Sequence, residues 1–207
     1  MSIAHFRELV RTEGLVGLTL EQYERMIEQG ILPEGEPIEL LDGFLFRKDR
    51  AKAGEDPMTV GYEHAYVVQR LMALNAMVPA HGCHFRCQLP IALPPDGAPE
   101  PDGAIVRGRP EDYRDHHPTA GDTPCVIEVA DNSLQRDRVT KLRIYADGGI
   151  SQYVIINLVE RVVEVYEHPL CGRGRYESSR RLEPSQSVRF SCAEGAGIEV
   201  PVASLLP

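Results

Sequence analysis

The chain has 207 residues, 43% of them hydrophobic and 26% charged, which is enough for one well-packed globular core. Its formal net charge of −9 at pH 7 argues against a protein that coats nucleic acid through a broad basic surface. The five cysteines are scattered and odd in number, which argues against a disulfide framework. No apolar run approaches the roughly 20 residues of a membrane span and the N-terminus lacks a signal-peptide pattern, so we expect a soluble cytoplasmic protein.

The N-terminal part of the chain predicts a short helix followed by a hairpin. Thr19 and Gln22 have the spacing of a capping box, which predicts a helix over about residues 20–29. Residues 38–47 are apolar and extended in character around an Asp-Gly dipeptide, which favours a tight turn and hence a β-hairpin. Residues 48–57 are polar with Gly and Pro, so we expect a loop.

The middle of the chain begins with the clearest helical pattern. Apolar side chains recur at three- and four-residue spacing over residues 63–78 and predict a helix that a proline ends. Residues 83–91 alternate between apolar and polar side chains, as in a strand with one face in the core. We expect a further strand over residues 99–106 and a surface excursion, rich in charge, His and Pro, over residues 108–124.

The remaining elements alternate between strand and helix before the chain becomes β-rich. We predict strands at residues 125–130, 152–158 and 162–166, with a helix over about residues 137–147 that two glycines close. The order helix, strand, strand, strand, helix, strand indicates an α/β (α+β) fold with a mixed central sheet flanked by helices and β-hairpins added at both ends. No internal repeat is visible.

One carboxylate stands where burial should be costly. Glu128 lies inside an apolar run, and strand alternation puts it on one face with Val126 and Ala130. The same rule groups Asp102 with Ala104 on the preceding strand, so the two acids converge if these strands pair. Two carboxylates about 5 Å apart repel by roughly 3 kcal/mol at an effective dielectric of 20, and a divalent cation reverses the sign. Oxygen ligands of this kind suit magnesium better than zinc.

The helix that follows supplies a cation. Asp137 and Lys141 are four residues apart and share one helix face. An apolar stripe is expected to lie against the sheet, and it consists of Val139, Leu142, Tyr145 and Ala146. This arrangement would aim the lysine ammonium at the carboxylate pair. A metal site with a nearby lysine is suited to phosphodiester hydrolysis.

These residues resemble the PD-(D/E)XK signature of restriction-endonuclease-like nucleases. Pro101-Asp102 in one strand and Glu128-Val-Ala in the next carry the resemblance. The sequence is more similar still to the bacterial Uma-type branch, and this similarity spans nearly the whole chain. It comprises IELLDG at residues 38–43, His64 at the start of the long helix, PDGAIV at residues 101–106 and the stretch over residues 127–158.

The resemblance implies one restriction-endonuclease-like domain over residues 1–207. We expect an N-terminal helical arm at residues 1–36 and a β-rich extension at residues 159–207. It also implies that Asp102 and Glu128 bind the metal, Mg²⁺ or Mn²⁺, with help from the Val129 carbonyl.

The family pattern places a lysine two residues after the glutamate, but this chain has Ala130 there. We infer that Lys141 reaches the same space from the helix. The resemblance further implies that Glu39 orients a water or a second ion, and that His64 contacts the scissile phosphate or supports Glu39. Gln88 is expected to line the same cleft.

The leading hypothesis is therefore a magnesium-dependent DNA endonuclease in which Asp102 and Glu128 hold the ion and Lys141 stabilises the transition state. Arg136 and Arg138 are candidate substrate contacts, and a homodimer would place two such arginine clusters on one duplex. The alternative is a non-catalytic nucleic-acid-binding or structural protein on the same fold, which the acidic composition favours.

Simpler explanations remain for several motifs. Glu128 could be neutralised by Arg143, and Asp137 could be no more than the helix partner of the lysine. Residues 81–87 (HGCHFRC) suggest zinc, but strand alternation would point the cysteines and His84 to opposite faces. The Asp-His-His run at residues 115–117 fits a solvated loop.

Overall fold

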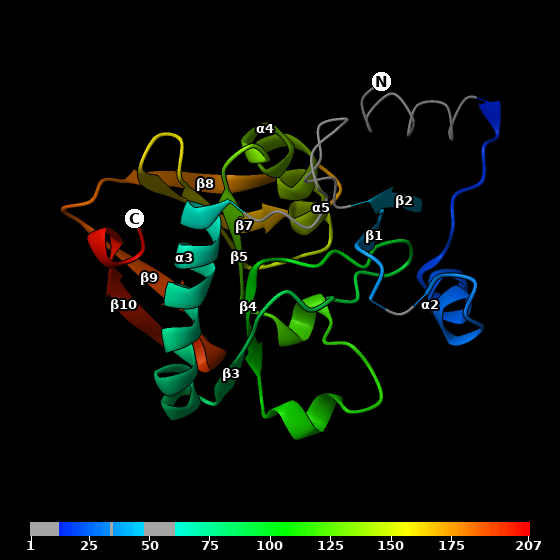
Figure 1. Ribbon diagram of the computed structural model, residues 1–207, viewed down its shortest axis with the longest axis horizontal. Helices are drawn as coiled ribbons and strands as arrows, with labels where there is room; N and C mark the ends of the chain where they lie inside the picture. Colours follow the sequence, from blue (N-terminus) through cyan, green and yellow to red (C-terminus); the bar gives the residue numbers. More distant parts are fainter. Residues whose placement is uncertain (1–12, 34, 48–60) are drawn as a thin grey trace. The chain divides into compact units, whose positions relative to one another are not determined.

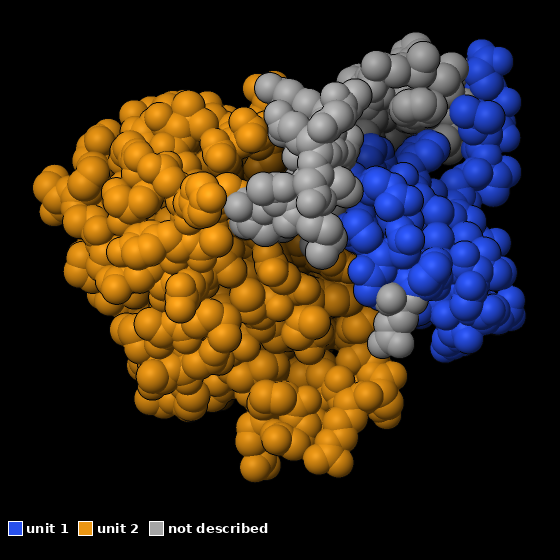
Figure 2. All heavy atoms as spheres, viewed as in Figure 1, with its two compact units in different colours: residues 1–59, 92–99 blue, residues 60–91, 100–207 orange. Residues whose placement is uncertain are grey.

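The computed structural model describes residues 13–33, 35–47 and 61–207. The chain forms two compact units: unit 1 holds residues 1–59 and 92–99, and unit 2 holds residues 60–91 and 100–207 (Figure 2). The predicted loop over residues 48–57 lies outside the described residues, and the single domain with its arm and extension stays a prediction. Among the described residues, no helix has both the length and the apolar character needed to cross a membrane.

Unit 1 contains the predicted first helix. Helix α2 (Leu20–Glu28) begins at Thr19, whose side chain accepts a hydrogen bond from the Gln22 backbone N–H at 3.2 Å. The Thr19 N–H donates in return to the Gln22 side chain at 2.8 Å, which completes the capping box. The apolar side of α2 packs through Tyr23 on Leu40 and Ala98.

The predicted hairpin is also present in unit 1. Strands β1 (Ile38–Leu41) and β2 (Phe44–Arg47) pair antiparallel. Asp42 and Gly43 between them have φ values of 52° and 78°, the left-handed backbone that a two-residue hairpin turn requires. A side chain at Gly43 would also be crowded, since its Cβ would lie 3.0 Å from the Leu18 carbonyl oxygen.

Unit 2 is built around a six-stranded sheet in the order β3-β4-β5-β6-β7-β8 (Figure 1). Its strands are β3 (Cys83–Arg86), β4 (Gly103–Arg107), β5 (Cys125–Ala130), β6 (Gln152–Asn157), β7 (Val162–Leu170) and β8 (Arg175–Leu182). β5 and β6 run parallel and all the other neighbours run antiparallel, so the predicted mixed sheet is confirmed. The parallel pair requires a crossover, and the second helical segment provides it.

The two faces of this sheet are covered by different elements. Helix α3 (Tyr62–Leu71) packs Val67 and Leu71 into a core with Ile127 and Val154, and the hairpin β9 (Ser187–Ser191) and β10 (Gly197–Pro201) joins the same core. The crossover from β5 to β6 covers the opposite face, where Glu128 lies. It consists of α4 (Leu134–Arg136), a π-helical turn (Asp137–Lys141) and α5 (Leu142–Asp147). The sheet is therefore the middle layer of unit 2.

Three predicted elements are shorter than expected by three residues or more. The strand predicted over residues 99–106 is limited to Gly103–Arg107, so Asp102 lies one residue before it. The helix predicted to reach residue 78 is α-helical only to Leu71 and continues as 3-10 turns at Met72–Ala76 and Val78–His81. Pro79 prevents an α-helical hydrogen bond to the carbonyl of Asn75, four residues earlier, because its ring clashes there and it has no N–H to donate. It does not account for the change at Met72. The strand predicted over residues 83–91 ends at Arg86, since Gln88 adopts a φ of 52° that breaks the extended backbone.

The helix predicted over residues 137–147 begins three residues earlier, at Leu134, and one residue of its predicted apolar stripe is wrong. Val139 is 56% exposed. It lies two residues from both Asp137 and Lys141, about 200° around the helix, so it must face outward when they face the sheet. The polar pair, and not Val139, covers this part of the sheet.

Candidate active site

The pairing of β4 with β5 brings the two acidic residues together. The antiparallel register joins Gly103 with Ile127 and Ala104 with Val126, and its continuation by one residue beyond β4 would set Asp102 opposite Glu128. The charge of Asp102 also acts on the pKa of Glu128. Residues directly opposite in such a pair have neighbouring side chains. The strand pairing on which the convergence of the two acids depends is therefore present.

Asp102 is held by three hydrogen bonds. Its Oδ2 accepts from the Val129 backbone N–H at 2.9 Å and contacts His64 Nε2 at 3.1 Å, and its Oδ1 accepts from Gln88 Nε2 at 3.3 Å. Burial raises the pKa of Asp102, but the His64 hydrogen bond and charge, the Val129 N–H and the Lys141 charge outweigh it and bring the pKa to about 2. Asp102 is therefore ionised at neutral pH.

Glu128 is almost completely buried and has its own partners. Its Oε1 accepts from Lys141 Nζ at 2.7 Å and from the Tyr145 hydroxyl at 2.8 Å. Burial raises the pKa of Glu128 to about 7, opposed by the Lys141 charge and assisted by the charges of Asp102 and Asp137. A carboxylate in an apolar strand is thus stabilised by an amine and a phenol from the crossover helix. Tyr145 was predicted only as a core residue, although its spacing of four from Lys141 could have indicated a shared face.

Arg143 is not the cation that pairs with Glu128. Its guanidinium lies 3.7 Å from Asp147, one helical turn further along the chain. The simpler explanation of Glu128 as an arginine-paired structural carboxylate is therefore wrong.

The π-helical turn buries both of its charged ends. Asp137 is 1% exposed and Lys141 is 4% exposed. The Ser133 hydroxyl bonds to the Asp137 carboxylate, and the Asp137 carbonyl accepts from the Tyr153 hydroxyl at 3.2 Å. Burial raises the pKa of Asp137, while the Lys141 charge lowers it. Asp137 is therefore a buried neighbour of the site and not only an exposed helix partner of the lysine.

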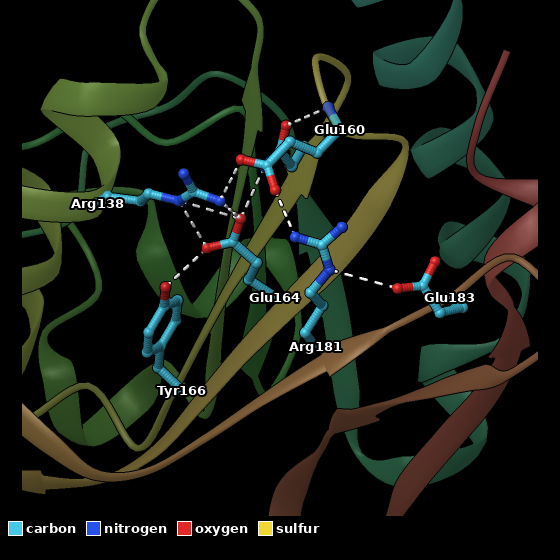
Figure 3. Close-up of polar contacts among 7 residues, drawn as sticks. Arg138, Glu160, Glu164, Tyr166, Arg181 and Glu183 are labelled. Atoms are coloured by element: carbon cyan, nitrogen blue, oxygen red, sulfur yellow. Dashed lines mark hydrogen bonds and ion pairs between the residues drawn. The ribbon is translucent and has the colours of Figure 1, made fainter.

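Arg138 is occupied by carboxylates. Its Nε lies 3.1 and 3.0 Å from the two Glu164 oxygens, and its Nη2 lies 2.6 Å from Glu164 and 2.8 Å from Glu160 (Figure 3). Arg181 bonds to the other Glu160 oxygen in the same network. These contacts neutralise Arg138 locally. In contrast, Arg136 Nε is buried and has no hydrogen bond within the described part of the chain. The two arginines thus differ in their hydrogen bonding, and the substrate contact of each stays a prediction.

Comparisons with known proteins show the family and the fold of this chain. The family Uma2, described as "Putative restriction endonuclease", matches residues 20–203. The chain belongs to this family. Among curated proteins, none matches the chain. A crystal structure titled as a putative nuclease belonging to DUF820, from Anabaena variabilis ATCC 29413, is 19% identical. The match covers 91% of this chain and 97% of the chain in that crystal structure, with a TM-score of 0.65. This Uma2 chain therefore has the restriction-endonuclease-like fold.

The remaining predicted site residues of this Uma2 chain stand as follows. Glu39 is buried on β1 of unit 1, and its role stays a prediction, as does metal binding by the Val129 carbonyl. Within residues 13–33, 35–47 and 61–207, no group of three or more His, Cys, Asp or Glu is arranged to hold a metal ion. The described residues therefore give no support to a zinc cluster at residues 81–87. Asp102 and Glu128 stay the predicted metal ligands.

Proposed function

We propose that this Uma2 protein is a divalent-metal-dependent endonuclease that hydrolyses phosphodiester bonds in DNA. The observation that carries the proposal is the opposed pair Asp102 and Glu128 with the buried Lys141 ammonium 2.7 Å from the glutamate. A core carboxylate pair is costly to bury, and an amine beside it is the charge arrangement that phosphoryl chemistry requires. Membership of the Uma2 family and the nuclease title of the similar structure support the same reaction class.

The donor atoms at this position fit a magnesium or manganese ion. Asp102 is ionised at neutral pH because its pKa is about 2. Glu128 uses Oε1 for its two hydrogen bonds, and its Oε2 accepts none from the described residues. Two carboxylates with the rest of the shell left to water and phosphate is the coordination that Mg²⁺ prefers. The ion would polarise the phosphate and lower the pKa of the attacking water.

The chain's own residues would hold the carboxylates and stabilise charge. His64 and Gln88 fix the orientation of Asp102 through their hydrogen bonds, and Tyr145 does the same for Glu128. Lys141 lies beside both acids and would stabilise the negative charge that develops on the non-bridging phosphate oxygens. We retain Arg136 as a proposed contact to the nucleic-acid backbone and Glu39 as a proposed orienting group.

The experiment compares Asp102→Asn and Glu128→Gln with the parent protein, using supercoiled plasmid and linear DNA with Mg²⁺ or Mn²⁺. Both changes are nearly isosteric, so we expect folded proteins that have lost cleavage. Glu199→Gln is the matched control, because it makes the same carboxylate-to-amide change at an exposed position on β10. It should cleave like the parent.

Metal binding provides a second readout that does not depend on activity. A metal that binds only the folded state raises the melting temperature as its concentration rises. We expect this rise with Mn²⁺ in the parent and in Glu199→Gln, and its loss in Asp102→Asn. Cleavage by either site variant would refute the assignment. Metal-induced stabilisation without cleavage of any DNA would favour the non-catalytic alternative.

A further inference from the structure

Arg86 lies on the same sheet face as the two carboxylates. It is the last residue of β3 and pairs with Ala104, which in turn pairs with Val126. Opposite residues share a face, so Arg86 lies on the face that carries Glu128. Relative to Asp102 it is a diagonal neighbour on the adjacent strand, at a separation of at most about 7–8 Å. Arg86 and Asp102 therefore lie on one face near the same end of the sheet.

The guanidinium of Arg86 is poorly satisfied for a side chain that is half buried. Its Nε is buried without a hydrogen-bond partner, and its contact to the Pro90 carbonyl is 3.5 Å long, at the outer limit of a hydrogen bond. No carboxylate among the described residues lies within ion-pair distance of it. Burial lowers the pKa of Arg86 from its usual value, and within the described ranges the charge effect that opposes it comes from Tyr113. Arg138, by comparison, has four hydrogen bonds to two glutamates.

A second unsatisfied polar atom lies on the same side of β3. His84 is two residues before Arg86 and is 8% exposed. Its Nδ1 contacts the Gly108 carbonyl at 3.0 Å, and its Nε2 is buried with no partner in the described part of the chain. Tyr113 packs on the His84 ring with 5.5 Å between ring centroids. A buried donor or acceptor without a hydrogen bond costs about 1–3 kcal/mol. Strand β3 carries two such atoms, Arg86 Nε and His84 Nε2, and a bound ligand is one explanation for them.

We propose that Arg86 is an anion-binding site that takes a backbone phosphate next to the scissile one. This inference rests on the proposed nuclease function for the identity of the ligand. A guanidinium is suited to the task because its planar donors match phosphate oxygens in pairs. Gln88, two residues after Arg86, donates a hydrogen bond to Asp102, so the end of β3 that carries Arg86 adjoins the carboxylates. The site explains why an arginine is kept half buried without a carboxylate.

The salt dependence of DNA binding tests the proposal. Binding of a fluorescein-labelled duplex is measured by anisotropy over about 50–300 mM NaCl, with every protein carrying Asp102→Asn so that the DNA stays intact. Loss of one phosphate contact lowers the slope of log K against log salt by about 0.9 for duplex DNA. We expect this lower slope for Arg86→Gln, together with weaker binding to all DNA sequences alike. Arg86→Lys keeps the positive charge, so its slope should equal that of the Asp102→Asn background protein.

Arg180→Gln is the matched control. Arg180 lies on β8, is 54% exposed and pairs with Glu167 at 2.8 Å, so its replacement makes the same charge change far along the sheet order from β3. Its slope should equal that of the background protein. A slope for Arg86→Gln equal to that of Arg180→Gln would overturn the proposal.

Inorganic phosphate separates this proposal from the proposed function. The melting temperature of the parent protein should rise more in sodium phosphate than in sodium chloride of equal ionic strength, and Arg86→Gln should lose this difference. No difference in the parent would overturn the anion site whatever the outcome with DNA. A phosphate effect that depends on Arg86, in a protein that neither binds nor cleaves DNA, would support the anion site and refute the nuclease.

Discussion

The buried ion pair between Glu128 and Lys141 makes the strongest quantitative prediction. The Nζ and Oε1 atoms are 2.7 Å apart and the side chains are 5% and 4% exposed. At an effective dielectric of 20 their gross attraction is about 6 kcal/mol, of which desolvation offsets a large part. Removal of one partner from such a pair costs about 3–5 kcal/mol, because the other charge stays buried and uncompensated.

The two single changes should not be equal. Lys141 also interacts with Asp102 and Asp137, so in Glu128→Gln the ammonium keeps two opposite charges. Among the described residues, Lys141 is the cation that most lowers the pKa of Glu128, and the other nearby charges acting on it are acidic. We therefore expect Lys141→Met to lower the free energy of unfolding by more than Glu128→Gln does at high pH, where Glu128 carries its charge. The difference should shrink as pH falls and the buried glutamate takes up a proton, because its pKa is already about 7 beside the lysine. The double variant should be more stable than the sum of the two losses predicts, with a coupling energy of about 2–3 kcal/mol.

Urea unfolding in the presence of EDTA measures this coupling without a contribution from bound metal. An exposed pair of the same length is the control: Arg161 Nη2 and Glu63 Oε1 are also 2.7 Å apart, but their side chains are 44% and 50% exposed. The cycle Arg161→Met with Glu63→Gln should give about 0.2–1 kcal/mol. Equal coupling in the two cycles, or none for the buried pair, would refute the assignment of Lys141 to Glu128.

Two further predictions concern the sheet around the site. Gly103→Ala should lower the free energy of unfolding by about 1–3 kcal/mol, because a Cβ there would lie 2.7 Å from Phe85 Cζ in the core. The control Gly121→Ala meets its nearest atom at an ordinary 3.7 Å and should change stability by less than about 0.5 kcal/mol in the same urea assay. Burial raises the pKa of Glu164. The hydrogen bonds of this carboxylate, the one from Arg138 first, lower the pKa by more than burial raises it, so the pKa lies below its usual value. The carboxylate therefore stabilises the fold above its unfolded pKa, and this contribution is lost as pH falls through the folded pKa. Arg138→Gln should reduce the acid-side loss of stability measured by thermal melts from about pH 7 to 3, and an unchanged pH dependence would show that the pair does not stabilise the fold.

The local patterns of the sequence predicted the parts of the site that lie on neighbouring elements. Strand alternation was sufficient to place Asp102 beside Glu128, since β4 and β5 are consecutive and pair directly. Four-residue spacing was sufficient to turn Asp137 and Lys141 to one helix face. Both depend only on the geometry of a strand or a helix, which the local sequence determines.

The parts that sequence did not predict depend on contacts between distant segments. The partner of Arg138 is Glu164, 26 residues away and on a strand reached through β6. Arg86 was placed on the polar face of its strand, but its lack of a carboxylate partner appears only when every neighbouring element is present. The end of β3 was missed because Gln88 takes a left-handed backbone that glycine and asparagine adopt more often.

The origin of the lysine has a consequence for how the centre is maintained. The sheet position two residues after Glu128 is Ala130, which is fully enclosed and paired with Asn157, so the amine comes from the crossover segment instead. The candidate site therefore depends on two parts of the fold: the strands hold the two acids, and the crossover segment holds the lysine and the tyrosine. These two parts can unfold locally and independently of each other. Transient unravelling of residues 134–147 would withdraw the ammonium and the phenol together while both acids kept their places on the strands. Under the proposed function, activity would then follow the opening equilibrium of that one segment, which amide hydrogen exchange measures directly.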